Sequence, residues 1–496
     1  MNNLTLSITT IGDLLLKGRI TRNRDSKPIE NVKLTIPVYQ RPYKWTARNA
    51  IQLLDDITEA MNDCKEVYRV GTLILHRDKE VYKIVDGQQR TITFALLLYS
   101  LYEIMNEDVE IEFLKQDVYD NSYNKHNIPN NLNAFKRRLG KIAEGDDKQD
   151  LKRLRDYVER QCELIVVITE DVSEAFQFFD SQNSRGKPLY PHDLLKAYHL
   201  REMADLDESK TEKIVKEWES IPQTDLASFF GDYLYRLKEW INGNWAYNLN
   251  ENNIYKFKGI TRSARTPYAQ FYKSAFSYAE LINLSSMPFV SGSREVNAFQ
   301  LNAPIIAGKP FFDYTKHYYG ILKDIQDNSQ YEGFYIKGNK IVKTLDRYFD
   351  RGVGNRITRL LFDTALLLYV DRFCPATYPT KVDTSLFEQF VTFAFIWAYS
   401  LRAQYYSLGW KSAQNYVLER RDKNIINSLN IYKQIIDADT PVSLLSNLAD
   451  KLSPIKNVAF EVVNKGIVNN SIDERDEEDV YVNFLYFFKQ NNYYAG

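Results

Sequence analysis

The chain has 496 residues, 44% of them hydrophobic and 26% charged, which is typical of a globular protein and excludes a disordered chain. Its 64 basic and 65 acidic residues leave a net charge of -1, so the total charge gives no support to attraction of the whole protein to nucleic acid or to a membrane surface. Three widely spaced cysteines, with no CxxC pair, exclude a disulfide framework and a zinc ribbon and favour a reducing compartment.

The N-terminal part predicts alternating strands and helices. Residues 32–36 alternate apolar and polar side chains before two prolines, which indicates a strand running into a loop. Residues 48–62 carry apolar residues at helical spacing. Residues 71–76 and 81–85 are short β-rich runs joined by a charged turn, which predicts a hairpin. Residues 91–105 predict a helix that is apolar on nearly every side and therefore buried.

The following polar region predicts a loop at residues 121–131 and a charged helical segment at 134–158. Residues 162–171 indicate another strand, because their centre is apolar and mostly β-branched. A helix, a Gly/Pro turn and a second helix complete a mixed α/β domain, which we place at residues 1–204. Helical periodicity dominates from residue 205 to 496, so the fold class is α+β with a helical second domain. We expect this second domain to regulate the first domain or to bind a partner or DNA.

No leader or membrane-spanning segment is predicted. The first twenty residues lack a basic stretch followed by an apolar one. The longest uncharged apolar stretch, residues 390–401, is shorter than the roughly 18 to 20 residues that span a bilayer. We therefore expect a cytoplasmic protein in which residues 390–401 form a buried helix.

One polar corner, DGQQR, separates the apolar runs of "YKIVDGQQRTITFALLLY". Gly87 can adopt a positive φ and admit a ligand close to the backbone. The helix that follows offers unpaired N–H groups, and Arg90 offers a planar fork suited to phosphate. Asp86 can hold a metal ion or orient a water, and Gln88 and Gln89 can donate to phosphate. The alternative is that Asp86 caps the helix while Arg90 pairs with a surface carboxylate.

Two further polar turns have the same chemical character. The turn at 183–187 contains Arg185 and Gly186 and can wrap a phosphate through backbone amides; its alternative is an ordinary helix C-cap. The segment "YQRPYKW", residues 39–45, mixes aromatic and cationic residues that can stack on a nucleobase and hold its phosphates. Its alternative is a proline-stiffened loop whose aromatics pack on the core. The three turns support one another only if they meet in space.

Local basic clusters are the expected places for DNA contacts. They lie at residues 135–141 and 151–155, and a solvated helix face is the favoured alternative for both. In the helical domain, Arg402, Gln404 and Tyr405 at the polar end of an aromatic helix can reach a shared cleft.

The segments "IPVYQRPYKW", "VDGQQRTIT" and "FFDSQNSRGKPLYPHDLLKAY" together resemble the N-terminal domain of anti-phage restriction proteins of the GmrS and SspE kind, over roughly residues 1–200. The resemblance implies a ParB/sulfiredoxin-like α/β fold. It also implies nucleoside triphosphate (GTP, ATP or UTP) binding and hydrolysis, with Mg²⁺, coupled to restriction of foreign or modified DNA. By position it implies catalytic roles for Asp86, Gln88, Gln89 and Arg90, with Asp86 as metal ligand, and nucleotide binding by Gln40, Arg41, Gly87, Asn183, Arg185, Gly186 and Lys187.

The chain departs from many relatives in its nuclease motifs. An HNH nuclease needs histidine, and none follows His317, so such a site is excluded from the C-terminal third. Asp193, Glu208 and Lys210 have the spacing of a PD-(D/E)xK site but lie in helical or polar sequence, and no Walker P-loop is present. We expect an NTP-hydrolysing subunit, with oligomerisation open, that regulates a separate nuclease. The alternatives are a non-hydrolysing nucleotide or DNA sensor and a ParB-like nuclease.

Overall fold

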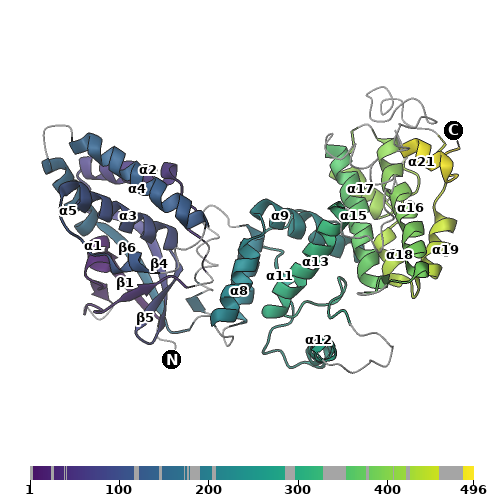
Figure 1. The fold of residues 1–496 in the computed structure, drawn as a ribbon, viewed down its shortest axis with the longest axis horizontal. Coiled ribbons are helices and arrows are strands. Elements are labelled where there is room, and N and C mark those ends of the chain that lie inside the picture. Colours follow the sequence, from purple (N-terminus) through teal and green to yellow (C-terminus); the bar gives the residue numbers. More distant parts are fainter. Residues whose placement is uncertain are drawn as a thin grey trace. The chain divides into compact units, whose positions relative to one another are not determined.

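The chain divides into two units in the computed structural model, one comprising Met1–Leu189 and Lys196–Ser220 and the other Tyr190–Leu195 and Ile221–Gly496 (Figure 1). Each unit is described by itself. The structure describes residues 4–23, 27–37, 40, 42–116, 122–143, 148–171, 174–175, 178, 190–203, 208–284, 296–327, 353–375, 379–405, 407–420, 425–456 and 484–495.

The first unit is built on a six-stranded mixed sheet in the order β2-β1-β6-β4-β5-β3. Strands β4 and β6 pair in parallel, as do β3 and β5, and the other pairs are antiparallel. The predicted hairpin is confirmed, because β4 and β5 pair across a turn at residues 79–80. The strands are β1 (Thr5–Thr10), β2 (Arg22–Asn23), β3 (Lys33–Thr35), β4 (Tyr68–Asp78), β5 (Val81–Asp86) and β6 (Cys162–Thr169).

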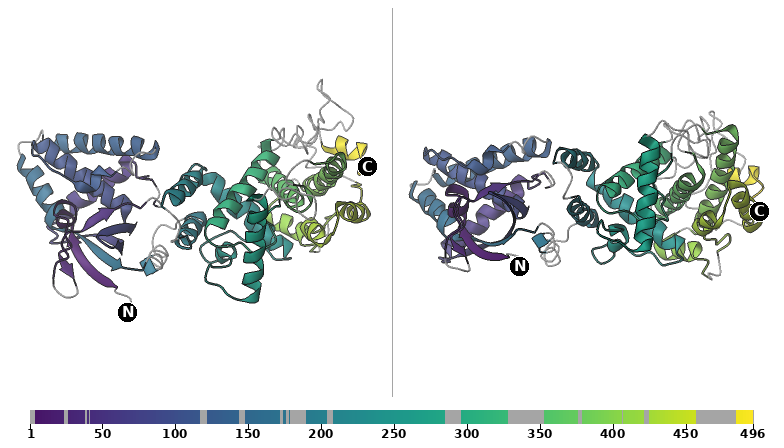
Figure 2. Two further views of the ribbon diagram at one scale, coloured as in Figure 1. Left: turned by 60° about the horizontal axis from the view of Figure 1, so that its bottom comes forward. Right: turned by 90° about the horizontal axis from the view of Figure 1, so that it is seen from below.

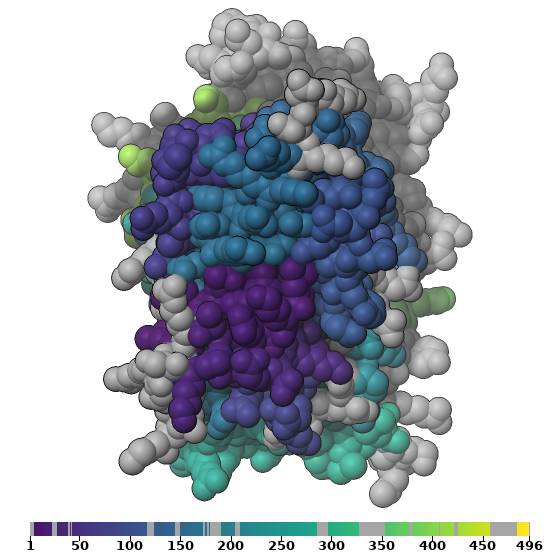
Figure 3. Space-filling view, turned by 90° about the vertical axis from the view of Figure 1, so that its left-hand side faces the viewer, coloured from purple at the N-terminus to yellow at the C-terminus, as the bar shows by residue number. Residues whose placement is uncertain are grey.

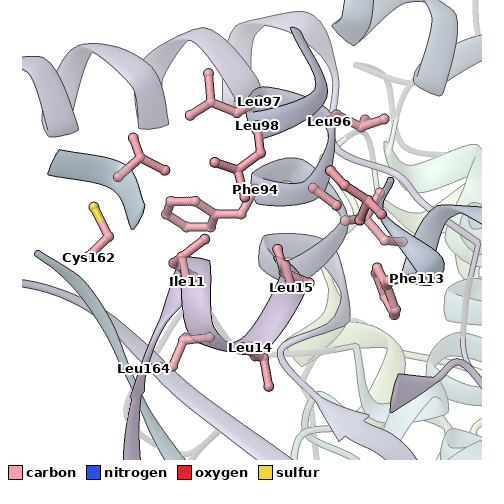
Figure 4. Close-up of a cluster of buried hydrophobic side chains, with 14 of the residues drawn as sticks. Ile11, Leu14, Leu15, Phe94, Leu96, Leu97, Leu98, Phe113, Cys162 and Leu164 are labelled. Atoms are coloured by element: carbon pink, nitrogen blue, oxygen red, sulfur yellow. The ribbon is translucent and has the colours of Figure 1, made fainter. Parts of the chain in front are cut away.

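Helices cover one face of this sheet and enclose the larger core of the unit (Figure 1). They are α1 (Ile11–Leu16), α2 (Ala47–Asn62), α3 (Gln88–Met105), α4 (Ser122–Ala143) and α5 (Lys148–Arg160), with a short 3₁₀ helix at Glu112–Lys115. Helix α3 is the predicted buried helix, and Phe94 on it meets Ile11 of α1 above the sheet (Figure 4). Helix α1 packs against α5, and Figure 3 shows the N-terminal segment (purple) beside the segment that follows residue 100 (blue).

The opposite face of the sheet carries a smaller apolar cluster. Ile74, Val85 and Val167 from three neighbouring strands pack there with Ala175 and with Ala197 of helix α7 (Pro191–Arg201). Helix α8 (Glu208–Glu219) completes the described part of this unit. The prediction of a mixed α/β N-terminal part is therefore confirmed.

One predicted element is wrong. Residues 121–131 were expected to form a loop, because asparagine and proline disfavour helices. Instead α4 begins at Ser122 and runs through Pro129 to Ala143. Three of its asparagines, at positions 124, 127 and 131, use their side chains to bind the backbone and the tyrosine of the loop at residues 42–46, and this tertiary contact outweighs the low local propensity.

The second unit is helical, as predicted (Figure 2). Its longest helices, α15 (Val353–Phe373) and α16 (Lys381–Gln404), pack on each other with Tyr369 stacked on Phe390 at 4.2 Å between ring centroids. The predicted buried helix at residues 390–401 is confirmed within α16. The other elements are α9 (Gln223–Ser228), a π-helix (Phe229–Tyr235), α10 (Arg236–Ile241), α11 (Tyr255–Lys258), α12 (Pro267–Leu284), α13 (Lys309–Asp327), α17 (Trp410–Val417), α18 (Ile431–Asp437), α19 (Pro441–Lys451) and α21 (Phe484–Gln490).

None of the helices in the described ranges is both long and apolar enough to cross a membrane.

Candidate functional site

The DGQQR corner lies where β5 ends at Asp86 and α3 begins at Gln88. Gly87 is the N-cap of α3 and has φ 96°, which confirms the predicted positive φ. A Cβ at this position would lie 3.0 Å from Cδ1 of Leu73 and 3.1 Å from the carbonyl oxygen of Thr72, so a larger residue is excluded by space as well as by conformation. The alternative in which Asp86 caps the helix is wrong, because the N-cap residue is Gly87.

The first turn of α3 is left without a capping side chain. The backbone N–H groups of Gln88, Gln89 and Arg90 make no hydrogen bond to any other residue that the structure describes. Helix N-termini carry a partial positive charge and unpaired donors, which together favour anions such as phosphate. The corner therefore offers three N–H groups to a ligand.

The two glutamines are almost equally buried, at 6% and 7% exposed, but they have different partners. Oε1 of Gln89 accepts from the N–H of Lys44 at 2.8 Å and of Trp45 at 3.2 Å, and its Nε2 donates to the carbonyl oxygen of Pro42 at 3.2 Å. Oε1 of Gln88 is buried and has no hydrogen-bond partner among the described residues. Gln89 thus holds the neighbouring loop, while Gln88 keeps an unused acceptor.

The loop at residues 40–46 meets the DGQQR corner, as the sequence argument required of these two turns. Nε2 of Gln40 donates to the carbonyl oxygens of Ile84 at 3.0 Å and Val85 at 2.7 Å, at the end of β5. Gln89 binds the other end of the same loop. The side-chain amides of Gln40 and Gln89 therefore join this loop to the DGQQR corner.

Tyr43 in this loop is fully buried, which matches the alternative that the aromatics pack on the core. Its hydroxyl shares a hydrogen bond of 2.7 Å with Thr93 and accepts from Nδ2 of Asn131 at 2.8 Å. Its backbone N–H donates to Asn124 and its carbonyl accepts from Asn127. Burial raises the pKa of Tyr43 above its usual value. Because the residue is fully buried, its ring is not available to stack on a ligand.

Arg90 lies against the backbone of β4. Its Nη1 donates to the carbonyl oxygen of Val70 at 3.2 Å. A Cβ on Gly71 would lie 1.7 Å from the same Nη1, so Arg90 occupies the space that the missing side chain leaves. Gly71 has φ +133° and lies at a register shift between β4 and β6. No ion pair of Arg90 is found in the described part of the chain, and the bond to Val70 is its one hydrogen bond there.

Gly71 is the residue that sequence reasoning missed. A glycine inside a β-rich run is itself a signal, because it weakens a strand and often marks a bulge or a close approach. Arg41, Asn183, Arg185, Gly186 and Lys187 lie outside the described residues. The meeting of the second predicted turn, at 183–187, with the corner therefore stays a prediction.

Residues 210–462, more than half of the chain, match the model of a family of unknown function (DUF7834). The chain belongs to this family. Residues 19–200 match the model of the GmrSD restriction endonuclease N-terminal domain. This match confirms the resemblance to GmrSD-type restriction proteins, and we call residues 19–200 the GmrSD-like domain. No curated protein matches the chain.

Three of the seven basic side chains in the two basic clusters, 135–141 and 151–155, pair with carboxylates. Arg138 pairs with Asp55 at 2.9 Å and Lys136 with Glu103 at 2.7 Å. Arg155 pairs with Glu107 at 2.6 Å. These pairs agree with the favoured alternative, in which the clusters form a solvated helix face. A DNA contact at these clusters stays a prediction.

The remaining described candidate residues lie on helices or make hydrogen bonds within the second unit. Asp193 lies on α7, and Glu208 and Lys210 lie on α8, so none of the three is on the strands that a PD-(D/E)xK site requires. Nε of Arg402 donates to Oδ1 of Asn355 at 2.6 Å inside the second unit. Gln404 binds both backbone groups of residue 426. The polar end of α16 thus ties its own unit together.

Proposed function

We propose that the DGQQR corner binds a nucleoside triphosphate, with GTP, ATP and UTP as candidates, and hydrolyses it. The observation that carries the proposal is the uncapped start of α3: three free N–H groups around Gly87, with the guanidinium of Arg90 and the unused buried oxygen of Gln88 beside them. A buried acceptor without a partner costs about 1–3 kcal/mol, which a ligand that donates to it would recover.

Each corner residue has a role in this proposal. The amides of the first turn and Arg90 bind the polyphosphate, and the charge of Arg90 stabilises charge that develops in the transition state. Gln88 accepts from a hydroxyl or a water of the bound ligand. Gln40 and Gln89 position the loop at 40–46 against the corner and do not touch the reacting atoms.

In this proposal a single carboxylate would hold magnesium at the corner. Within the described ranges, no group of three His, Cys, Asp or Glu side chains could hold a metal ion. Mg²⁺ in nucleotide sites is held by one or two carboxylates together with phosphate oxygens and waters, so Asp86 at the end of β5 would be the protein ligand. The ion would supply charge neutralisation between phosphate oxygens.

The match to the GmrSD restriction endonuclease N-terminal domain supports a role as a component of a restriction system acting on modified DNA. In the proposal, nucleotide turnover at the corner regulates cleavage of foreign DNA, and a separate nuclease subunit cuts. Binding of DNA or of that subunit by the helical part belongs to the same proposal.

Phosphate release by the purified chain tests the proposed chemistry. It is measured with each triphosphate, with Mg²⁺, and with and without DNA. Arg90→Ala and Asp86→Asn are expected to lose turnover at least tenfold, because each removes a group that contacts phosphate or metal. Arg77→Ala removes an equally cationic side chain from β4, which pairs with Glu170 at 3.8 Å and lies outside the corner, and should leave turnover unchanged. Equal turnover in all four proteins would overturn the assignment.

A sensor that binds nucleotide without hydrolysing it is a second candidate. It is favoured by the commitment of Gln89 and Gln40 to backbone groups, since this leaves few side chains to activate a water. Nucleotide binding that depends on Arg90, with no phosphate released under any condition, would support the sensor. The third alternative, a ParB-like nuclease, predicts plasmid nicking by the chain alone.

A further inference from the structure

A cavity of about 420 Å³ lies in the helical unit between α12, residues 296–306 and the start of α13. None of the described residues that line it has a charged side chain: five aromatic rings stand there with proline, aliphatic residues and two amides. The rings are those of Phe271, Tyr272, Phe276, Phe299 and Tyr314, and the amides are those of Asn297 and Gln300. Ligand sites of this size are typically apolar and aromatic with a few polar groups that fix orientation.

Polar ties hold one wall of this cavity in place. The N–H of Leu301 donates to Oδ2 of Asp371 at 2.9 Å, and Nζ of Lys238 donates to the carbonyl oxygen of Leu301 at 3.1 Å. Further along, the N–H of Ile260 donates to the carbonyl oxygen of Ile305 at 2.8 Å. A Cβ on the neighbouring Gly259, which has φ +69°, would lie 2.2 Å from that oxygen. Hydrogen bonds at Leu301 and at Ile305 therefore fix the wall segment.

Helix α12 forms the other wall (labelled in Figure 1). The side chain of Asn283 binds both backbone groups of Val296, at 2.8 and 2.9 Å. The ring of Phe276 lies 5.7 Å from that of Phe299 between centroids. These ties keep the two walls apart at a defined spacing, so the space between them is built before any ligand arrives.

One buried polar atom in the lining has no hydrogen-bond partner among the described residues. The hydroxyl of Tyr314 is buried and makes no hydrogen bond in the described part of the chain, and the residue is only 2% exposed. Burial keeps its pKa far above the usual value, so the hydroxyl is a permanent donor. An unmade hydrogen bond of this kind is costly in a protein interior, and a ligand acceptor would satisfy it.

We propose that this cavity binds a nucleobase, presented either by unpaired DNA or as a free nucleoside. The rings provide stacking faces for a planar heterocycle, and Asn297, Gln300 and Tyr314 provide donors and acceptors for its edge. The described lining residues are uncharged, which favours the neutral base over the phosphates. The site is separate from the DGQQR corner, and the proposal stands whether or not that corner hydrolyses nucleotides.

Calorimetric titration of the full chain tests the site with two kinds of probe: nucleosides with natural or 5-substituted bases, and short single-stranded oligonucleotides with or without one abasic position. Nucleosides lack phosphates, so Arg90→Ala should bind them as the unaltered protein does. Binding of nucleosides alone identifies a free ligand. Binding of oligonucleotides that weakens at the abasic position identifies a base presented by DNA.

Variants locate the binding. Phe299→Ala removes a stacking face and is expected to weaken binding about tenfold to a hundredfold. Tyr314→Phe keeps the ring, and we expect a loss of about threefold to tenfold in affinity with no loss of thermal stability. Tyr255→Ala, an exposed tyrosine on α11 outside the cavity, is the matched control and should bind normally. The proposal is overturned if no probe binds at millimolar concentration, if Phe299→Ala binds unchanged, or if Arg90→Ala abolishes nucleoside binding.

Discussion

Gln88 and Gln89 are adjacent, chemically identical and equally buried, yet the structure predicts opposite results when each is replaced by leucine. Gln89→Leu removes the partner of three backbone groups, those of Pro42, Lys44 and Trp45. Each hydrogen bond contributes about 1 kcal/mol, and a buried group left unpaired costs more, so the variant should be destabilised by about 2 to 4 kcal/mol. Gln88→Leu removes a buried oxygen that has no partner, so stability should be unchanged or up to about 1 kcal/mol higher.

Hydrogen exchange gives a local readout, because the backbone amides of Lys44 and Trp45 are the groups that donate to Gln89. A loss of 2 kcal/mol corresponds to roughly 30-fold faster exchange at these two amides in Gln89→Leu. In Gln88→Leu their exchange should match that of the unaltered protein, while nucleotide affinity falls. Equal acceleration in both variants, or a Gln88→Leu protein that binds nucleotide normally, would refute the division of roles between the two residues.

Three further predictions follow from single contacts. Gly71→Ala places a Cβ 1.7 Å from Nη1 of Arg90 at a positive φ, so we expect a loss of about 1–3 kcal/mol in the free energy of unfolding, measured in urea, and turnover reduced at least tenfold. Asn131→Leu leaves the hydroxyl of buried Tyr43 short of a donor and should cost about 1–3 kcal/mol, measured by thermal unfolding. Burial raises the pKa of Asp371 from 3.8 to about 6, so the folded state favours the protonated carboxyl. The contribution of this group to stability is therefore present below pH 4 and is lost as the pH rises towards 6, by at most about 1.4 kcal/mol per pH unit; Asp371→Asn should remove this slope from urea unfolding curves.

Local signals in the sequence were enough to predict the corner itself. A β-rich run ending in Asp86, a glycine, and a helical apolar run define a strand-to-helix turn, and φ 96° at Gly87 follows from residue type and position. The hairpin of β4 and β5 was equally local. These features depend on residues within a few positions of one another, which a single sequence displays directly.

The division of roles within the corner could not be predicted, because the partners come from distant positions. Gln89 binds a loop 44 to 47 residues earlier in the chain, and Arg90 lies on a backbone 20 residues earlier. The asparagines of α4 bind the same loop across more than 80 residues, and their spacing of three and four positions was the one available sign of a helical face. The composition of residues 121–131 favours a loop, but the contact of these asparagines with the loop at residues 42–46 stabilises a helix.

Helix α8 connects the two family matches physically. It lies within the residues matched by the DUF7834 model, yet it belongs to the unit of the GmrSD-like domain. Its last residue, Glu219, pairs with Lys196 of α7 at 2.7 Å and lies 3.8 Å from Nζ of Lys44, in the loop that Gln89 holds. Lys196 is only 5% exposed, and a buried lysine requires a carboxylate partner. A carboxylate from the sequence matched by the second family therefore pairs with a buried lysine of the GmrSD-like domain, and Lys44, in the loop beside the DGQQR corner, lies near the same group.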